Sequence, residues 1–105
     1  MKKKIYNKLV RDKIPDLIKS DSCIPKIQIL NQADYLKYLN KKLKEELEEF
    51  LSSEDIEELA DLYEIMLAIL KSRQISVNEF EAIRLKKVQE RGAFDQKILL
   101  ISVEK

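Results

Sequence analysis

The sequence contains no histidine and no tryptophan, and among its 105 residues it has one glycine, two prolines and one cysteine. Without histidine, a Ser-His-Asp triad, His-ligated zinc and a Glu-x-x-His di-iron site are all excluded. A glycine-rich phosphate loop and the spacing of an EF-hand loop are also absent. Any metal site must therefore be built from oxygen ligands, and carboxylates suit Mg²⁺ or Mn²⁺.

The shortage of helix breakers favours long helices, and 105 residues suit a single domain spanning 1–105. The net charge of +1 gives no reason to expect stable nucleic-acid binding. One cysteine, Cys23, cannot form an intramolecular disulfide, which suits a reducing compartment. No apolar leader follows the first lysines, and no apolar run reaches transmembrane length. We therefore expect a cytoplasmic protein with no membrane contact.

Acidic residues concentrate in the middle of the chain, where residues 45–64 hold ten acids and no base. Four of them form two pairs at spacing i, i+3, Glu46 with Glu49 and Glu58 with Asp61. Residues three apart are neighbours on one helix face. Two antiparallel helices could therefore bring all four carboxylates together.

The second acidic pair lies beside residues 59–70, whose apolar side chains cover almost the whole circumference of a helix. Such a helix is normally buried. Glu58, Asp61 and Ile65 share one narrow stripe, so the two acids should face packed protein and need cations. No lysine or arginine lies between Glu45 and Leu70, and a bound metal ion is the simplest alternative. A solvated acidic helix face is the competing interpretation of these residues.

The rest of the chain predicts a mainly all-α fold with about four helices and a minor short β pair. The first helix is expected over residues 9–19, with Pro15 near its first turn. Residues 26–30 (KIQIL) and 97–103 (KILLISV) have β-type patterns and could pair with each other.

Three longer helices are expected. The first covers residues 32–51, the second follows Ser52 and ends near residue 71, and the third covers residues 77–90. Asn31 is the predicted N-cap of the first, and Ser52 and Ser76 open capping boxes for the other two. Gly92 is the predicted left-handed C-cap of the last. On the first of these helices Glu46 borders the apolar stripe, whereas Glu45 and Glu48 are expected to point away from it.

The segments KLKEELEEF and EELADLYEI resemble the Glu-Glu-x-x-Glu … Glu-x-x-Asp signature of the MazG-like all-α nucleoside triphosphate pyrophosphohydrolases. The opening YNKLVRDKIPDLI and the ending ERGAF resemble a small house-cleaning branch of that superfamily, related to phosphoribosyl-ATP pyrophosphohydrolase. The resemblance covers nearly the whole chain. Only eight residues separate Glu49 from Glu58, so the helices must turn tightly and an inserted base-binding segment is absent.

The resemblance implies an enzyme that uses Mg²⁺, with Mn²⁺ as a second option, to cleave a nucleoside triphosphate into a monophosphate and pyrophosphate. The metal ligands it implies are Glu46, Glu49, Glu58 and Asp61, with Glu46 as the catalytic base. Basic groups that could bind the substrate phosphates are Lys8, Arg11, Lys13 and Arg91. The apolar helix and the family both lead us to expect a homodimer or higher homo-oligomer, in which the basic N-terminal segment of one chain could reach the acids of another.

Two other functions fit the same residues. One is hydrolysis of phosphoribosyl-ATP, an enzyme narrower than house-cleaning of non-canonical nucleotides. The other is a non-enzymatic helical module whose acidic face binds a basic partner, which predicts no dependence on divalent metal.

Overall fold

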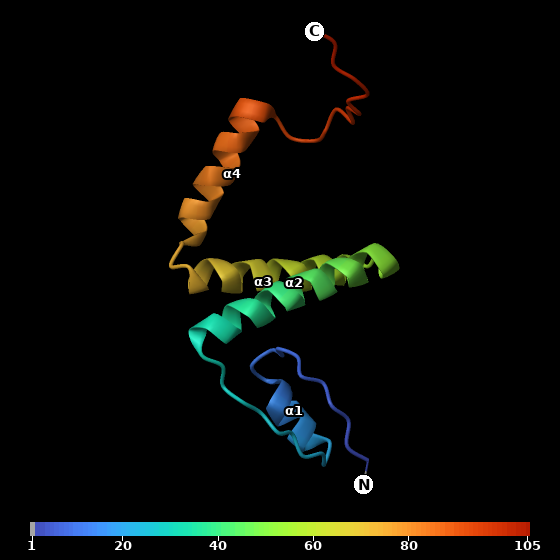
Figure 1. Cartoon of the computed structure of the whole chain (residues 1–105), viewed down its shortest axis with the longest axis vertical. Coiled ribbons are helices and arrows are strands. Elements are labelled where there is room, and N and C mark those ends of the chain that lie inside the picture. The colour runs from blue at the N-terminus through green and yellow to red at the C-terminus, as the bar shows by residue number, and fades with distance from the viewer. Residues whose placement is uncertain (1) are drawn as a thin grey trace.

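A computed structural model describes residues 2–105, and over these residues the chain is all-α with four helices, as the sequence predicts. The helices are α1 (Ile14–Ser20), α2 (Gln32–Ser53), α3 (Ile56–Ser72) and α4 (Val77–Arg91). The two central helices run antiparallel and lie side by side, with α1 and α4 on opposite sides of them (Figure 1). We call α2 and α3 together the central hairpin.

The central hairpin contains the core of the chain. Leu39 from α2 is only 2% exposed, and Ile65 and Leu70 from α3 are also buried. α2 begins where predicted, because the Asn31 side chain accepts a hydrogen bond from the Asp34 amide at 2.8 Å. A two-residue connection, Glu54 and Asp55, then reverses the chain into α3. The tight turn that the short spacing between the acidic pairs predicts is therefore present.

The caps around this turn differ from the prediction. Ser52 lies inside α2, and the N-cap of α3 is Asp55, whose side chain accepts from the Glu57 amide at 3.2 Å. The left-handed C-cap falls on Glu54 (φ 57°, ψ 21°), which ends α2 without a glycine. Gly92 has φ 84° but ψ 177°, so it ends α4 without the left-handed helical conformation that the sequence suggested. The Ser76 cap of α4 is as predicted, like the Asn31 cap of α2, and its hydroxyl accepts from the Glu79 amide at 3.0 Å.

The first helix is shorter than expected, because α1 begins at Ile14 rather than at residue 9. Pro15 explains the start, since proline fits the first turn of a helix and is unfavourable farther inside. Residues 2–11 precede this helix as irregular chain. This freedom lets the basic N-terminal segment lie against α2 and α3.

The predicted β pair is not formed within residues 2–105, where no strand is found. Residues 26–30 connect α1 to α2, whereas residues 97–103 lie beyond α4 at the other end of the molecule (Figure 1). A strand needs a neighbour to satisfy its backbone groups, and neither segment has the other within reach.

The chain as a whole is extended, with principal extents of 66 × 32 × 25 Å. Its radius of gyration is 18.8 Å, whereas a compact domain of this length has about 13 Å. Its accessible surface is 10246 Å², against roughly 6,100 Å² for a compact monomer of this mass. Much of α3 that the sequence predicts to be buried is also open, including Tyr63 and Leu59. The single chain thus leaves uncovered far more apolar surface than a compact monomer would.

Over residues 2–105, none of the helices combines the length and the apolar character that a membrane crossing requires.

Candidate functional site

The acids on the central hairpin converge as two overlapping groups. In the first, Glu46, Glu58 and Asp61 each place one carboxylate oxygen so that all three lie within 4.8 Å of one another. In the second, Glu45, Glu46 and Glu49 do the same. Glu46 belongs to both groups, and it joins the acids of α2 to those of α3. We call these five residues the acidic cluster.

Glu46 lies deepest in the acidic cluster, with only 6% of its surface exposed. Its Oε2 atom and the Oε2 atom of Glu58 are both buried, and neither has a hydrogen-bond partner among the described residues. Burying a carboxylate oxygen without a partner is costly. These two oxygens, one from each helix, are therefore the atoms of the hairpin that most need a cation or a proton.

The electrostatics of the acidic cluster reflect this crowding. Burial raises the pKa of Glu46 above its ordinary value, and the adjacent Glu49 carboxylate raises it further. Burial, together with the negative charge of Glu49, raises the pKa of Glu58 to about 7. Like charges that share a site favour protonation of one of them. A divalent cation would relieve the same repulsion.

Cations from outside the acidic stretch also reach the cluster. The Arg11 guanidinium donates to Asp61 Oδ1 at 2.7 Å, and Lys8 Nζ lies 3.1 Å from Glu45 Oε1. Both come from the N-terminal segment of the same chain, whereas the sequence suggested that this segment could reach the acids of another chain. Neither cation forms a hydrogen bond with the buried Oε2 atoms of Glu46 and Glu58.

The site residues expected from the sequence do not include Lys42, although it lies four residues before Glu46, a spacing that forms ion pairs on helices. Its Nζ atom is 3.5 Å from Glu46 Oε1 and 3.6 Å from Glu45 Oε1. Glu45 is expected from the sequence to point away into solvent, but it is half-buried. Burial by itself raises the pKa of Glu45, and its pairing with Lys8 and Lys42 outweighs this and holds the pKa below the usual range. The fold of the N-terminal segment over α2 explains the difference.

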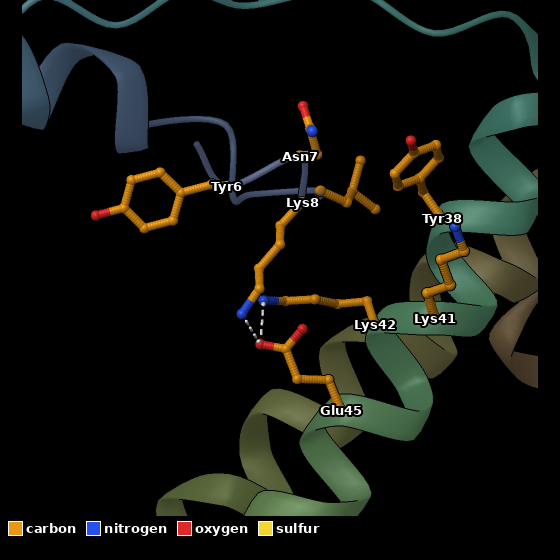
Figure 2. Close-up of a pocket in the computed structure, with 8 residues that line it drawn as sticks. Tyr6, Asn7, Lys8, Tyr38, Lys41, Lys42 and Glu45 are labelled. Carbon is orange, nitrogen blue, oxygen red and sulfur yellow. Dashed lines mark hydrogen bonds and ion pairs between the residues drawn. The ribbon is translucent and has the colours of Figure 1, made fainter. Parts of the chain in front are cut away.

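A cavity of about 240 Å³ adjoins this part of the cluster. The N-terminal segment lines one side and α2 the other, and the Lys8 and Lys42 ammonium groups meet at one oxygen of Glu45 (Figure 2). Three ammonium groups, from Lys8, Lys41 and Lys42, stand here against the carboxylates of Glu45 and Glu46, so this corner keeps a positive charge, which favours an anionic ligand. The residues that line the cavity are Tyr6, Asn7, Lys8, Leu9, Tyr38, Lys41, Lys42 and Glu45.

The two other basic residues singled out in the sequence lie elsewhere. Lys13 is exposed at the N-cap of α1, and over residues 2–105 it forms no ion pair. Arg91 ends α4, which among the helices of residues 2–105 contacts only α3, and it lines a hollow with residues 92–98. Figure 1 shows the end of α4 on the opposite side of the hairpin from α1. Within one chain, Arg91 and the N-terminal cations therefore do not meet.

Comparison with known proteins adds no relative: no family model matches the chain, and neither the curated proteins nor the solved structures give a match. An all-oxygen acidic cluster with buried, unpartnered oxygens, flanked by arginine and lysine, can bind a divalent cation beside a phosphate-bearing ligand.

Proposed function

We propose that this protein is a Mg²⁺-dependent nucleoside triphosphate pyrophosphohydrolase that cleaves between the α- and β-phosphates. The observation that carries the proposal is the pair of buried, unpartnered Oε2 atoms of Glu46 and Glu58 at the centre of the acidic cluster. The resemblance of the two acidic segments to the MazG-like signature supports the choice of reaction. House-cleaning of non-canonical nucleotides is the physiological role that the same resemblance favours.

The residues proposed to hold the metal are Glu46, Glu49, Glu58 and Asp61. Their donor set is all carboxylate oxygen, which Mg²⁺ and Mn²⁺ prefer, and three of them already lie within 4.8 Å through one oxygen each. When bound, such an ion neutralises phosphate charge and lowers the pKa of a bound water. Asp61 can still accept from Arg11 through Oδ1 while its other oxygen is free for the ion.

The remaining steps fall to the chain's own side chains. Glu46 is the proposed general base, because its burial raises its proton affinity and it lies at the junction of both acidic groups. Arg11 and Lys8 are proposed to stabilise the negative charge that develops on the leaving pyrophosphate. The positive corner lined by Lys8, Lys41 and Lys42 is the surface beside the cluster best suited to phosphate oxygens.

The proposal includes a homodimer or higher homo-oligomer in the cytoplasm. The support for self-association is the exposed apolar surface of α3 together with the large accessible area of the single chain. The support for the compartment is the single, exposed Cys23.

Product analysis tests the reaction type. Purified protein is incubated with a panel of nucleoside triphosphates, with and without Mg²⁺, and the products are identified by phosphorus NMR. We expect monophosphate and pyrophosphate, a sharp loss of activity in Glu46→Ala and Glu49→Ala, and little loss in the exposed control Glu48→Ala. Inorganic phosphate as the primary product would refute the proposed cleavage position.

Metal binding is tested separately by thermal melting. Mg²⁺ or Mn²⁺ should raise the melting temperature of the wild type, because a ligand that binds only the folded state stabilises it. Glu58→Ala and Asp61→Ala should each abolish the rise, and Glu48→Ala should keep it. A wild type that shows neither metal-dependent melting nor hydrolysis would instead favour the acidic interaction module.

A further inference from the structure

Two segments outside the helices expose apolar side chains to an unusual degree. In residues 26–30, Ile29 is 87% exposed and Ile27 is also open. In residues 97–103, which we call the C-terminal segment, Ile101 is 88% exposed. Its other large apolar residues are equally open: Ile98, Leu99, Leu100 and Val103. Isolated exposed apolar residues are ordinary, but a continuous run of them marks a contact surface.

The backbone of both segments is also unpaired. Over the described chain, neither residues 26–30 nor residues 98–103 form a backbone hydrogen bond with each other or with any helix. Both segments are rich in isoleucine and leucine and have no proline or glycine within them. Such segments pair readily with another strand, and left open they are a site of aggregation. A covering partner strand is therefore expected for each of them.

The two segments cannot cover each other within one chain. Residues 26–30 lie on the α1 side of the central hairpin, and the C-terminal segment lies beyond the far end of α4 (Figure 1). The molecule extends 66 Å along its long axis, and the hairpin stands between the two segments. Two copies related by a two-fold axis, with their long axes antiparallel, would bring each C-terminal segment beside residues 26–30 of the other copy.

We propose that two copies of this chain exchange their C-terminal segments, so that residues 97–103 of each copy form a β ladder with residues 26–30 of the other. The proposal goes beyond the enzymatic function and does not depend on it. Because the two-fold exchange is reciprocal, it forms two equivalent ladders and leaves neither segment open. It also accounts for why the sequence predicts a β pair that one chain does not form.

The surface area favours exchange over a flat contact between two finished monomers. The chain exposes roughly 4,000 Å² more than a compact monomer of its mass. A large obligate interface covers about 1,000–2,500 Å² per partner. Exchange of a terminal segment, added to packing between helices, buries more surface per copy than a flat patch can. A second copy is also the one partner whose complementary strand is present in this sequence.

Proline substitutions test the ladders in the full-length protein. Leu100→Pro and Ile29→Pro each remove a backbone donor from a proposed strand and lie outside all four helices. Each is expected to weaken dimerisation on the order of tenfold to a hundredfold, because symmetry places the change in both ladders. Light scattering over a dilution series measures the effect, and circular dichroism should show unchanged helix content.

Glu104→Pro, just beyond the C-terminal segment, is the matched control and should dimerise like the wild type. A wild-type mass near a single 12.4 kDa chain at micromolar concentration would overturn the proposal. So would a dimer that both proline variants leave unchanged, because the contact would then lie elsewhere.

Disulfide trapping tests which segments meet. In a Cys23→Ser background, a Gln28→Cys chain is mixed with a Leu100→Cys chain carrying a mass tag. Gln28 and Leu100 are the central residues of the two segments, so a ladder that pairs the segments centre to centre places them opposite each other whichever way the strands run. Directly paired strand residues are close enough for a disulfide. Oxidation should trap the mixed dimer.

The control pairs Leu100→Cys with Glu48→Cys, an exposed position on α2, and should give no comparable product. Equal trapping of both pairs, or no trapping of Gln28→Cys with Leu100→Cys in a sample that is dimeric by light scattering, would contradict the exchange.

Discussion

The central hairpin and the two ends of the chain are held by different kinds of contact. The hairpin has a buried apolar centre at Leu39, Ile65 and Leu70, and short-range caps fix where its helices begin. Residues 2–13 and 92–105 have no regular structure beyond turns, yet the first of these segments supplies cations to the acids on the hairpin. The hairpin therefore sets the geometry of the acids, whereas the N-terminal segment contributes part of their charge environment through Lys8 and Arg11.

The largest expected effect comes from a substitution in the buried core of the central hairpin. Leu39→Ala should lower the free energy of unfolding by about 2–5 kcal/mol, because it opens a cavity at a side chain that is 2% exposed. Leu51→Ala, on the exposed side of the same helix, should cost less than about 1 kcal/mol. Urea denaturation at one protein concentration measures both. Similar losses would mean that the two positions are equally covered in the assembled protein.

The next effect separates charge from geometry at the site. Arg11→Ala should reduce turnover on the order of tenfold, because it removes a cation proposed to stabilise the leaving pyrophosphate. The same change should tighten Mg²⁺ binding on the order of threefold, since a positive charge next to Asp61 is lost. Steady-state kinetics and calorimetry give the two readouts. Lys13→Ala should change neither the turnover nor the Mg²⁺ affinity. If Arg11→Ala lowered both, the role of Arg11 would instead be to stabilise the structure of the site.

A smaller effect tests the caps that bound the helices. Ser76→Ala should destabilise the protein by about 1 kcal/mol, because the hydroxyl accepts from the Glu79 amide at the start of α4. Ser52→Ala should change stability by only a few tenths of a kcal/mol or raise it, since Ser52 lies inside α2 and alanine is the better helix former. Denaturation curves of the two variants measure both changes in stability. Equal losses of stability in the two variants would support the capping box that the sequence predicts at Ser52.

The smallest effect concerns the pH dependence of the metal-free protein, because Glu58 is partly open to solvent. Its pKa is raised from 4.5 to about 7, so the folded state favours the protonated acid. The stability that this protonation contributes is present below pH 4.5 and is lost as the pH rises towards 7. Glu58→Gln, a neutral replacement, should therefore melt higher than the wild type at pH 8 and close to it at pH 4.5.

These melting curves are recorded with a chelator, so that no divalent cation masks the repulsion. Glu48→Gln is the control at an exposed position and should show no pH-dependent difference from the wild type. A Glu58→Gln difference of the same size at both pH values would speak against crowding as the cause of the shift.

Local signals in the sequence predicted the hairpin well. Asn31 and Ser76 cap their helices as expected, and α3 and α4 end within one residue of the predicted positions. The convergence of the two acidic pairs also followed from their spacing and the short turn. The Ser52 cap was wrong because Asp55, three residues later, caps α3 while α2 continues.

Contacts between distant parts of the chain could not be predicted in the same way. The pairing of Lys8 with Glu45 joins residues 37 apart, and that of Arg11 with Asp61 joins residues 50 apart. The β-type patterns of residues 26–30 and 97–103 were visible, but a pattern does not say where the partner strand lies. Lys42, by contrast, was predictable from its spacing to Glu46 alone.

Because the turn at Glu54 and Asp55 has only two residues, the geometry of the acidic cluster depends on the number of residues between its two acidic pairs. Each residue added to α2 between Glu49 and the turn would rotate the Glu46–Glu49 pair by about 100° around the helix axis and move it about 1.5 Å along that axis. The turn cannot compensate for this rotation and shift, because only two residues separate the end of α2 from the start of α3. A single insertion there would therefore disperse the carboxylates while every one of them remained in the sequence. At this site the number of intervening residues constrains the chemistry as strongly as the identity of the acids.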